Sequence, residues 1–540
     1  MPSAGDVRFR ERPVVAERVS PAERSSIDAA GLWSASPLAL AVFALLFAVA
    51  LLPVLAMPIP AMVDYPNHLA RMHILVRDGT PASHPFYRVT WAFYPNLAMD
   101  LVVPRIARLT GVESATRLFL LASQILTVTG ACAIEFAVKR RFQVSGFLAL
   151  MVLYSVPFAW GFVNFQFALG LALWGVAAWI TLQDRGWALR LASHTLFVAL
   201  LFGSHLFALG LYGFTLGMHE MWRARSRHPP LRETVLRFLA LALPALLAFG
   251  VMRASGGSVG QEGTAWNGQA KLIMAFATLN GYDLWLSAAG TIILVGLTAL
   301  LALRGAFRPV QSGYWLAAGL ACLFVVLPSR LFDTAFVDLR VTVAALLIVP
   351  GFIVVSPPSR AWGRIAGAAI LGLTVANVSC ALAIAAIYRG EYAALLTSFE
   401  QLKPGSRVLV GHSGSGKDPP LDDLADYPIY NAATLAVAYA DAFVPTLFTS
   451  IGKQPVTVID AYRPLAVPYG GPTPTAILRE VAEGRPSDEA PGYTRAWTKD
   501  FDYLYVVGPS APNPMPGLLV PLAASSRFAL YRIEKPGPSE

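Results

Sequence analysis

The chain has few charged residues and very few cysteines. Of its 540 residues, 14% are Asp, Glu, Lys or Arg, and three are Cys. Soluble globular domains carry about 25% charged residues, so a soluble protein is excluded. Cys132, Cys322 and Cys380 lie within apolar runs and lack the spacing of a metal site. Neither a disulfide framework nor a cysteine metal centre is therefore predicted.

Long apolar runs fill most of the first 390 residues. Hydrophobic residues make up 55% of the chain. An apolar stretch of roughly 17 to 25 residues crosses a hydrocarbon core about 30 Å thick. We predict an α-helical polytopic membrane protein with about eleven transmembrane helices. The spans are expected at 37–57, 116–138, 144–161, 164–182, 191–204, 205–222, 233–252, 285–303, 312–328, 341–356 and 365–388.

Basic residues gather in short breaks between these runs, for example at Lys139 to Arg141 and Arg360 to Arg364. This is the positive-inside pattern, and it explains the net charge of +9 without a nucleic-acid partner. The 1–36 tail is then cytoplasmic in a bacterial inner membrane, and an odd number of crossings puts the C-terminus on the periplasmic side. Because both halves of 191–222 are short for a crossing, half-length or re-entrant helices are expected to meet near residues 203–205.

The composition changes after Tyr388, and residues 400–540 alternate strand-like and helix-like segments. Strands are predicted at 406–411, 455–460, 501–508 and 527–535, and helices at 431–443 and 474–484. This alternation predicts a soluble periplasmic α/β domain. The predicted organisation is therefore a tail (1–36), a transmembrane domain (37–388) with a long outer loop (58–115), and the α/β domain. The segment GHSGSGKD (411–418) has Asp418 where a phosphate loop needs Ser or Thr, and prolines follow at once. No ATP site is predicted.

The outer loop holds the most suggestive polar residues. VDYPNHLAR (63–71) follows the first apolar run and opens the first of two predicted juxtamembrane helices. His68 and Arg71 are four and seven residues after Asp64, so the three share one helix face if Asp64 belongs to the helix. Asp100 lies on the second helix. Asp64 either caps a helix, with Pro66 in its first turn, or joins Asp100 and His68 in activating a hydroxyl or holding a divalent cation.

The arrangement of a first span, a long outer loop starting with Asp64, two juxtamembrane helices, many further spans and an outer α/β domain resembles the GT-C superfamily. The DYPNHLAR and DAFVPTLFT segments also resemble uncharacterised bacterial multi-span proteins. GT-C proteins are membrane glycosyltransferases that use polyprenyl-phosphate-linked sugar donors. The resemblance implies the lipid bilayer and such a donor as partners, and the transfer of a sugar to an acceptor at the periplasmic face.

The resemblance also implies roles for individual residues. Asp64 matches the family's catalytic acid of the first outer loop, and Asp100 is the candidate for its second acid, with His68 beside them. Arg340 matches the family's donor-phosphate binders, followed by Arg330 and Lys271. Independently of the resemblance, Arg71 by its spacing to Asp64 and His205 as an ionisable residue at an outer turn are further substrate-binding candidates. Many members carry adjacent acids, whereas Tyr65 and Pro66 follow Asp64 here. A bound Mg²⁺ or Mn²⁺ therefore remains open.

Two other classes of function remain open. A transporter or flippase for a lipid-linked substrate would share the membrane setting, although the predicted spans hold few ionisable residues. A non-catalytic envelope protein whose outer domain binds a partner is the third class. An enzyme requires Asp64, Asp100 and Arg340 to serve one substrate.

Overall fold

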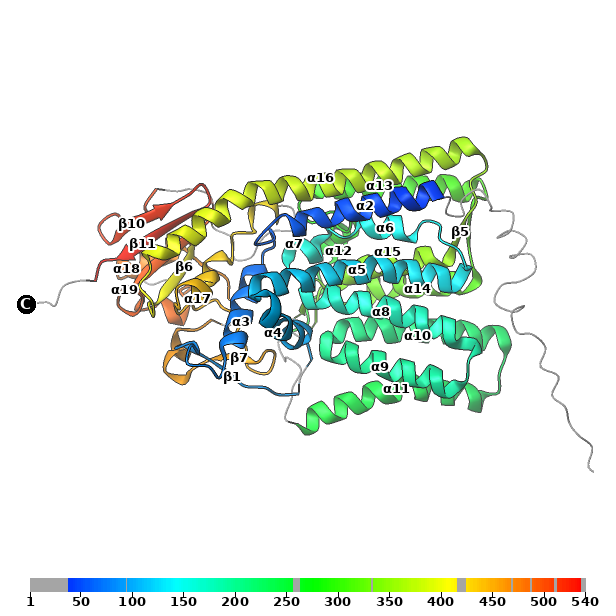
Figure 1. The fold of residues 1–540 in the computed structure, drawn as a ribbon, viewed down its shortest axis with the longest axis horizontal. Helices are drawn as coiled ribbons and strands as arrows, with labels where there is room; N and C mark the ends of the chain where they lie inside the picture. The colour runs from blue at the N-terminus through cyan, green and yellow to red at the C-terminus, as the bar shows by residue number, and fades with distance from the viewer. Residues whose placement is uncertain are drawn as a thin grey trace, which may run out of the picture.

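The computed structural model describes residues 37–93, 95–255, 263–331, 334–414, 424–467, 470–485, 488–508 and 512–535. The predicted tail and the second half of GHSGSGKD (415–418) lie outside these residues. Within them, a long helical bundle carries the C-terminal domain at one end (Figure 1). The first helix of the bundle, α2, starts at the opposite end and runs toward the domain.

Seven helical segments in the described part of the chain are long and apolar enough to cross a membrane. The fold class, a polytopic α-helical membrane protein with a C-terminal α/β region, is therefore confirmed. The seven contain α2 (Pro37–Leu55), α5 (Val112–Lys139), α8 (Val163–Thr181), α9 (Trp187–Ser204), α11 (Leu231–Ala254), α13 (Leu284–Leu303) and α16 (Arg360–Ser398).

The other predicted spans correspond to shorter or less apolar helices. These are α10 (Leu206–Arg227), α14 (Gln311–Val326), the pair α6 (Ser145–Met151) and α7 (Val156–Trp160), and α15 (Val337–Ile348), which continues into a 3₁₀ turn, η3 (Val349–Phe352). The prediction of half-length helices in 191–222 is wrong. α9 and α10 are continuous helices of 18 and 22 residues, and His205 separates them in an extended conformation. The predicted spans counted only apolar residues, so they left out the polar helical residues at the start of α9 and at the end of α10.

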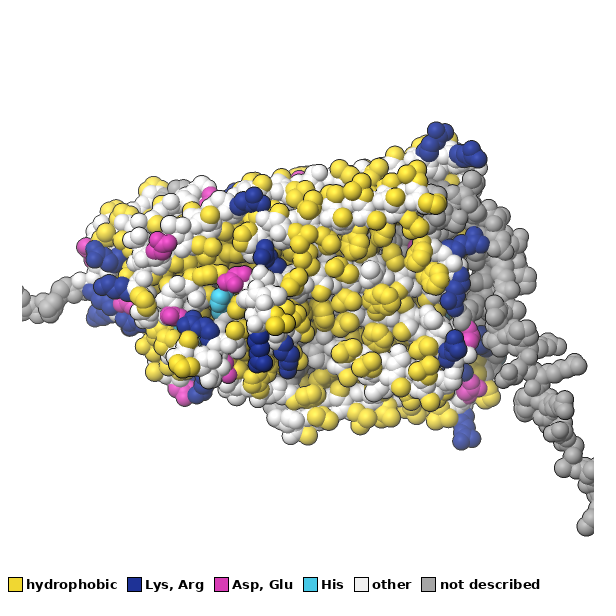
Figure 2. Space-filling model, in the orientation of Figure 1, with side chains coloured by type: hydrophobic (Ala, Val, Ile, Leu, Met, Phe, Trp, Pro, Cys, Tyr) yellow, Lys and Arg dark blue, Asp and Glu magenta, His cyan; other side chains and the backbone are white. Residues whose placement is uncertain are grey.

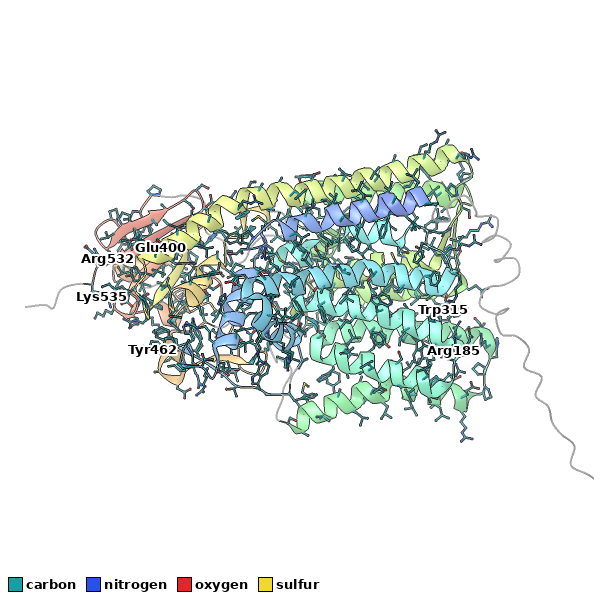
Figure 3. All side chains as sticks on the ribbon, in the orientation of Figure 1. Arg185, Trp315, Glu400, Tyr462, Arg532 and Lys535 are labelled. Atoms are coloured by element: carbon teal, nitrogen blue, oxygen red, sulfur yellow. The ribbon has the colours of Figure 1, made fainter. Side chains whose placement is uncertain are left out.

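The surface of the bundle is apolar along its middle. Lys and Arg side chains lie in a band at the end opposite the C-terminal domain and in a second band near the domain (Figure 2). Arg185 lies at the former end, whereas Arg532 and Lys535 lie on the domain (Figure 3). A bilayer would cover the apolar belt between the bands, because charged side chains are costly in hydrocarbon.

The C-terminal domain is built on a five-stranded mixed sheet in the order β10-β11-β9-β6-β8. β6 pairs in parallel with β8 and β9, and the other pairs are antiparallel. The prediction located β6, β9, β11 and helix α18 but not β10 or β8. The bounds are β6 (Val408–His412), β8 (Thr473–Pro474), β9 (Tyr503–Val507), β10 (Leu519–Ala524), β11 (Phe528–Ile533), α17 (Ala436–Tyr439), α18 (Thr475–Ala482) and α19 (Trp497–Asp500).

The outer loop and the C-terminal domain are built together. β1 (Tyr87–Val89) of the loop pairs with β7 (Val456–Val458) of the domain, so the strand predicted at 455–460 lies outside the main sheet. Helix α3 (Tyr65–Arg77) contacts α17 and the 3₁₀ turn η6 (Ala432–Leu435). The outer loop therefore packs directly against the C-terminal domain.

The two loop helices differ in burial. α3 was expected along the membrane interface, but nine of its 13 residues are buried. Only α4 (Ala98–Thr110) keeps an amphipathic exposed face, with Leu101, Arg105 and Leu109 turned outward. α3 is buried because the C-terminal domain covers the side that sequence periodicity assigned to lipid headgroups.

Short elements lie between α11 and α13, between α14 and α15, and at the end of the bundle opposite the C-terminal domain. They are α12 (Gly268–Phe276), the hairpin β3 (Arg330–Leu331) and β4 (Thr334–Ala335), and the pair β2 (Phe307–Pro309) and β5 (Ile353–Val355).

Candidate active site

Asp64 occupies the N-cap position of α3, but its side chain makes no capping hydrogen bond. Instead, the Asn431 side-chain amide of the C-terminal domain donates a 3.0 Å hydrogen bond to Oδ1 of Asp64. The Asp64 backbone N–H donates to the Trp160 carbonyl at the end of α7, at 2.9 Å. The Asp64 residue is thus held from both sides, through its backbone and its carboxylate, and helix capping does not account for the position of the carboxylate.

The turn between α7 and α8 allows this close approach because it contains Gly161. Gly161 has φ +104°, a conformation that side-chain-bearing residues rarely adopt. A Cβ at this position would lie 2.9 Å from the Cβ of Asp64. Glycine is therefore needed here both for the backbone conformation and for the space beside the carboxylate.

Asp64 and His68 are the partly exposed residues in an otherwise buried segment. From Ala61 to Arg71, every other residue is buried. Burial by the surrounding protein atoms raises the pKa of Asp64 to about 8, against a smaller lowering by the Asn431 hydrogen bond. The carboxyl group therefore changes protonation near neutral pH while keeping an opening to solvent.

His68 lies one helical turn after Asp64 and bonds to the same turn. Its Nε2 is 3.1 Å from the Gly161 carbonyl oxygen. A carbonyl accepts only, so Nε2 carries the proton and Nδ1 is a lone-pair acceptor. Nδ1 is buried and has no hydrogen-bond partner in the described part of the protein. Burial, with Arg71 adding to it, lowers the pKa of His68 to about 3, so the ring is neutral at physiological pH.

Arg71 and Asp100 form a buried ion pair that joins α3 to α4. Two nitrogens of Arg71 lie 2.9 and 3.0 Å from the two carboxylate oxygens of Asp100. Nη1 of Arg71 donates to the Gln454 side chain of the C-terminal domain at 2.7 Å. Only the contact from Nη2 to Oδ2 has hydrogen-bond geometry, so the pair is a close ion pair with one direct hydrogen bond. Asp100 is therefore occupied by Arg71, and the pair ties both loop helices to the domain.

Arg340 lies on α15, on the other side of the α7–α8 turn. Its guanidinium carbon is 4.3 Å from the Phe162 ring centroid and 4.8 Å from that of Phe165. A nitrogen of Arg340 is 3.1 Å from Nε2 of His205. Among the described residues no carboxylate oxygen lies within 4.0 Å of the buried Arg340 side chain. A buried cation without a counter-ion is a natural binder of an anion.

The turn formed by Trp160 to Phe162 links the predicted base to the predicted phosphate binder. Asp64 bonds to Trp160, His68 bonds to Gly161, and Arg340 stacks on Phe162. Phe336, just before α15, packs on Trp160 at 4.8 Å between ring centroids. Asp64, His68, Arg340 and His205 therefore belong to one connected group of residues.

The two remaining basic candidates differ from Arg340. Nζ of Lys271 donates to the backbone carbonyls of Phe324 and Leu327, and it lies 3.9 Å from Asp338. Arg330 is exposed on β3. Lys271 is therefore already satisfied at the end of α14, whereas Arg330 is accessible from outside.

The residues offer no ready ligand set for Mg²⁺ or Mn²⁺. In the described ranges, no group of three or more His, Cys, Asp or Glu side chains is placed to hold a metal ion. Asp64 is bonded to a neutral amide and Asp100 to a guanidinium. No chemical step is therefore assigned to a metal.

The sequence did not point to three residues of this site. Asn431 and Gln454 lie more than 350 positions from the side chains they contact. Gly161 looked like one of many glycines. Polar residues of a predicted outer domain and a glycine between two apolar runs were the available signals, and neither specifies a partner.

No family model and no curated protein matches the sequence. Solved structures that resemble the fold include two of ArnT from Cupriavidus metallidurans. The structure bound to undecaprenyl phosphate shares 12% identity and a TM-score of 0.48, covering 91% of this chain and 97% of its own. The apo structure shares 14% identity and a TM-score of 0.42, covering 92% and 98%. At these TM-scores the neighbours by themselves fix neither an activity nor a site.

Proposed function

We propose that the protein is a membrane glycosyltransferase of GT-C type. It would transfer a sugar from a polyprenyl-phosphate-linked donor to an acceptor hydroxyl at the end of the bundle that carries the C-terminal domain. In a bacterial inner membrane this end would face the periplasm. The donor's lipid chain would lie in the bilayer, and its phosphate would reach the site at the membrane boundary.

The placement of Asp64 one helical turn before His68, with both residues bonded to the turn between α7 and α8, carries the proposal. A carboxyl group whose pKa is raised to about 8 is a stronger base than an ordinary aspartate. A general base works best when its pKa is near the working pH. Asp64 and His68 are partly exposed, whereas every other residue from Ala61 to Arg71 is buried. A structural carboxylate would more commonly be paired with a cation, as Asp100 is with Arg71.

In the proposed reaction the ionised Asp64 takes the proton of the acceptor hydroxyl. The acceptor oxygen forms a bond to the anomeric carbon, and the bond from that carbon to the phosphate oxygen breaks. The electron pair leaves with the polyprenyl phosphate, which gains a negative charge. Arg340, a buried guanidinium without a carboxylate partner in the described residues, would stabilise this charge. Arginine suits the role because its donors form a rigid fork.

The other predicted residues take supporting roles in the proposal. The lone pair on Nδ1 of His68 would accept a hydrogen bond from the acceptor and orient it. His205 contacts Arg340 and would fix the guanidinium. The Arg71–Asp100 pair would be a positioning element that holds α3. Asp100 is proposed neither as a base nor as a metal ligand, because it is buried with the Arg71 guanidinium 2.9 and 3.0 Å from its two oxygens.

The test is sugar transfer by membranes containing the full chain, with a panel of polyprenyl-phosphate-linked sugars as donors. Asp64→Asn keeps the size and the acceptor oxygen of the side chain but cannot take up the proton. We expect its transfer rate to fall by about 100-fold or more. Asp460→Asn is the matched control, because Asp460 is an exposed acid of the same outer region. Asp64→Asn membranes that transfer sugar as fast as wild type would refute the proposal.

A further inference from the structure

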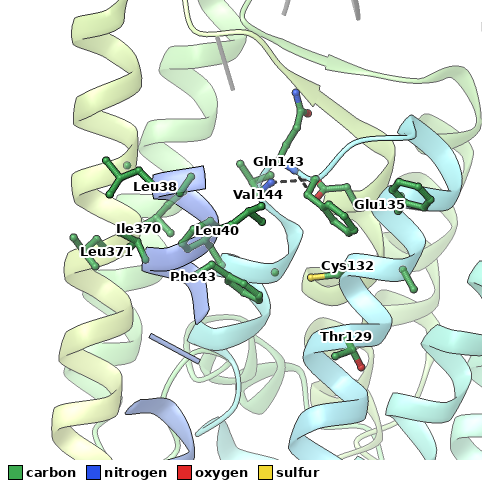
Figure 4. A pocket seen from close by; sticks show the side chains of 18 of the residues that line it. Leu38, Leu40, Phe43, Thr129, Cys132, Glu135, Gln143, Val144, Ile370 and Leu371 are labelled. Atoms are coloured by element: carbon green, nitrogen blue, oxygen red, sulfur yellow. Dashed lines mark hydrogen bonds between the residues drawn. The ribbon is translucent and has the colours of Figure 1, made fainter. Parts of the chain in front are cut away.

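A large groove lies at the end of the bundle opposite the C-terminal domain. Its volume is about 1610 Å³, and it opens between α2 and α16 on one side and α5 and α8 on the other (Figure 4). None of Asp64, His68 and Arg340 lines it. The groove is therefore separate from the proposed active site.

The walls of the groove are apolar. Leu38, Leu40 and Phe43 of α2 face Cys132 of α5, and Leu371 belongs to the α16 wall (Figure 4). Small residues such as Ala133, Ala177 and Gly146 line part of the groove. Gly146 itself is tightly packed, because a Cβ there would come within 2.8 Å of the Phe43 ring. An apolar hollow on a lipid-facing surface fits a hydrocarbon chain, since lipid fills it without exposing apolar surface to water.

The acidic residue in the wall is already neutralised. Glu135 pairs with Lys139 at 2.9 Å and accepts the backbone N–H groups of Gln143 at 2.8 Å and Val144 at 3.1 Å. Its charge is therefore compensated within the protein. It would neither attract a cationic ligand nor repel an anionic one strongly.

Two arginines stand at the rim without partners. Arg360 and Arg364 line the groove one helical turn apart at the start of α16, and both are exposed. In the described part of the chain neither forms an ion pair or a side-chain hydrogen bond. Cations at a helix N-terminus oppose the helix dipole, which favours an anion there. The start of this 39-residue helix thus combines two unpaired cations with a favourable dipole end.

We propose that this groove binds an anionic membrane phospholipid. One acyl chain would lie between α2 and α5, and the phosphate would bind Arg360 and Arg364 at the membrane boundary. Basic pockets between membrane helices are suited to anionic lipid headgroups. A soluble ligand would not need so long an apolar wall, and a zwitterionic lipid would leave the two arginines only partly compensated. The site is independent of the proposed sugar transfer.

The experiment is native mass spectrometry on the delipidated full-length protein in detergent. It is titrated separately with dioleoylphosphatidylglycerol, dioleoylphosphatidylcholine and undecaprenyl phosphate. We expect the phosphatidylglycerol complex to be favoured over the phosphatidylcholine complex by about 30-fold. The double variant Arg360→Gln and Arg364→Gln should lose this preference. The control, Arg232→Gln with Arg308→Gln, removes two positive charges that do not line the groove and should keep it.

A second variant separates the groove from general surface charge. Ala133→Phe places a ring in the groove from α5 and leaves both arginines intact. It should weaken phosphatidylglycerol binding, with circular dichroism and melting temperature confirming that the variant is folded. Equal binding of the two phospholipids by wild type would overturn the proposal, as would undiminished binding by the arginine double variant. Tighter binding of undecaprenyl phosphate, lost in the same variants, would overturn the choice of a phospholipid.

Discussion

The side-chain amide of Asn431 donates a 3.0 Å hydrogen bond to the carboxylate of Asp64. Asn431 belongs to the C-terminal domain, and Asp64 is the outer-loop residue directly before α3. The bond therefore couples the outer domain to the residue proposed as the catalytic base. It also lowers the pKa of a carboxyl group that burial raises to about 8.

Asp64→Asn should stabilise the protein at alkaline pH. Because the pKa of Asp64 is raised on folding, the folded state holds a proton that the unfolded state has lost between about pH 4 and pH 8. Stability therefore falls as pH rises through this window, and the cost is complete above pH 8. A neutral amide removes the cost. We expect the melting temperature of Asp64→Asn to exceed that of wild type by a few degrees at pH 9 and to match it near pH 4. A constant difference across this range would contradict the raised pKa.

Gly161→Ala should reduce sugar transfer through Asp64. The added Cβ would lie 2.9 Å from the Cβ of Asp64, and φ at this position is +104°. The matched control is Gly79→Ala, where φ is +71° and nothing lies within 4 Å of the added Cβ. Alanine in a left-handed backbone conformation costs about 1 to 2 kcal/mol in both variants, measured by thermal unfolding. Transfer should fall by at least about tenfold only in Gly161→Ala, and an equal fall in both would reduce Gly161 to a structural glycine.

Arg71 and Asp100 should behave as a structural pair. Asp100→Leu alone leaves a buried guanidinium without its partner and should cost about 3 to 5 kcal/mol. Replacing both residues with Met and Leu should recover most of that loss, because a buried ion pair contributes little over apolar packing. Chemical denaturation or thermal unfolding measures both effects. An inactive but fully stable Asp100→Leu protein would instead support the catalytic role that the resemblance implied.

Arg340→Gln should weaken donor binding without unfolding the protein. A charge-assisted hydrogen bond to phosphate contributes about 1.5 to 3 kcal/mol, so KM for the lipid-linked donor should rise by about 10- to 150-fold. The melting temperature should stay level or increase, because a buried charge without a carboxylate partner is removed. Lys271→Gln is the control, since Lys271 donates to backbone carbonyls. An unchanged donor KM in Arg340→Gln would remove Arg340 from the site.

Local patterns predicted the membrane helices and most of the outer domain's elements. Apolar run length located α2, α5 and α16, and the alternation of strand-like and helix-like segments after residue 400 located β9 and β11. The pairing of β7 with β1 was beyond such patterns, because it joins segments more than 360 residues apart. Burial of α3 was missed for the same reason, since its covering surface comes from the C-terminal domain.

For the candidate site too, local sequence identified single residues but not their contacts with distant parts of the chain. Asp64 and Arg340 stood out because charged residues are few near membrane spans, and the resemblance assigned them roles. Sequence spacing placed His68 and Arg71 on the face of Asp64. It did not show that Arg71 turns to Asp100, or that Asn431 binds Asp64. These contacts depend on how the domain docks on the loop.

The most direct test of Asp64 as the base is the pH dependence of kcat/KM for sugar transfer, compared between wild type and Asn431→Leu. The rate of wild type should rise with pH and level off above about pH 8, as the carboxyl group ionises. Removing the Asn431 hydrogen bond removes a contact that lowers the pKa, so the rise in Asn431→Leu should move to higher pH. A rise at the same pH in both proteins, or a rate independent of pH between 6 and 9 in wild type, would contradict the assignment.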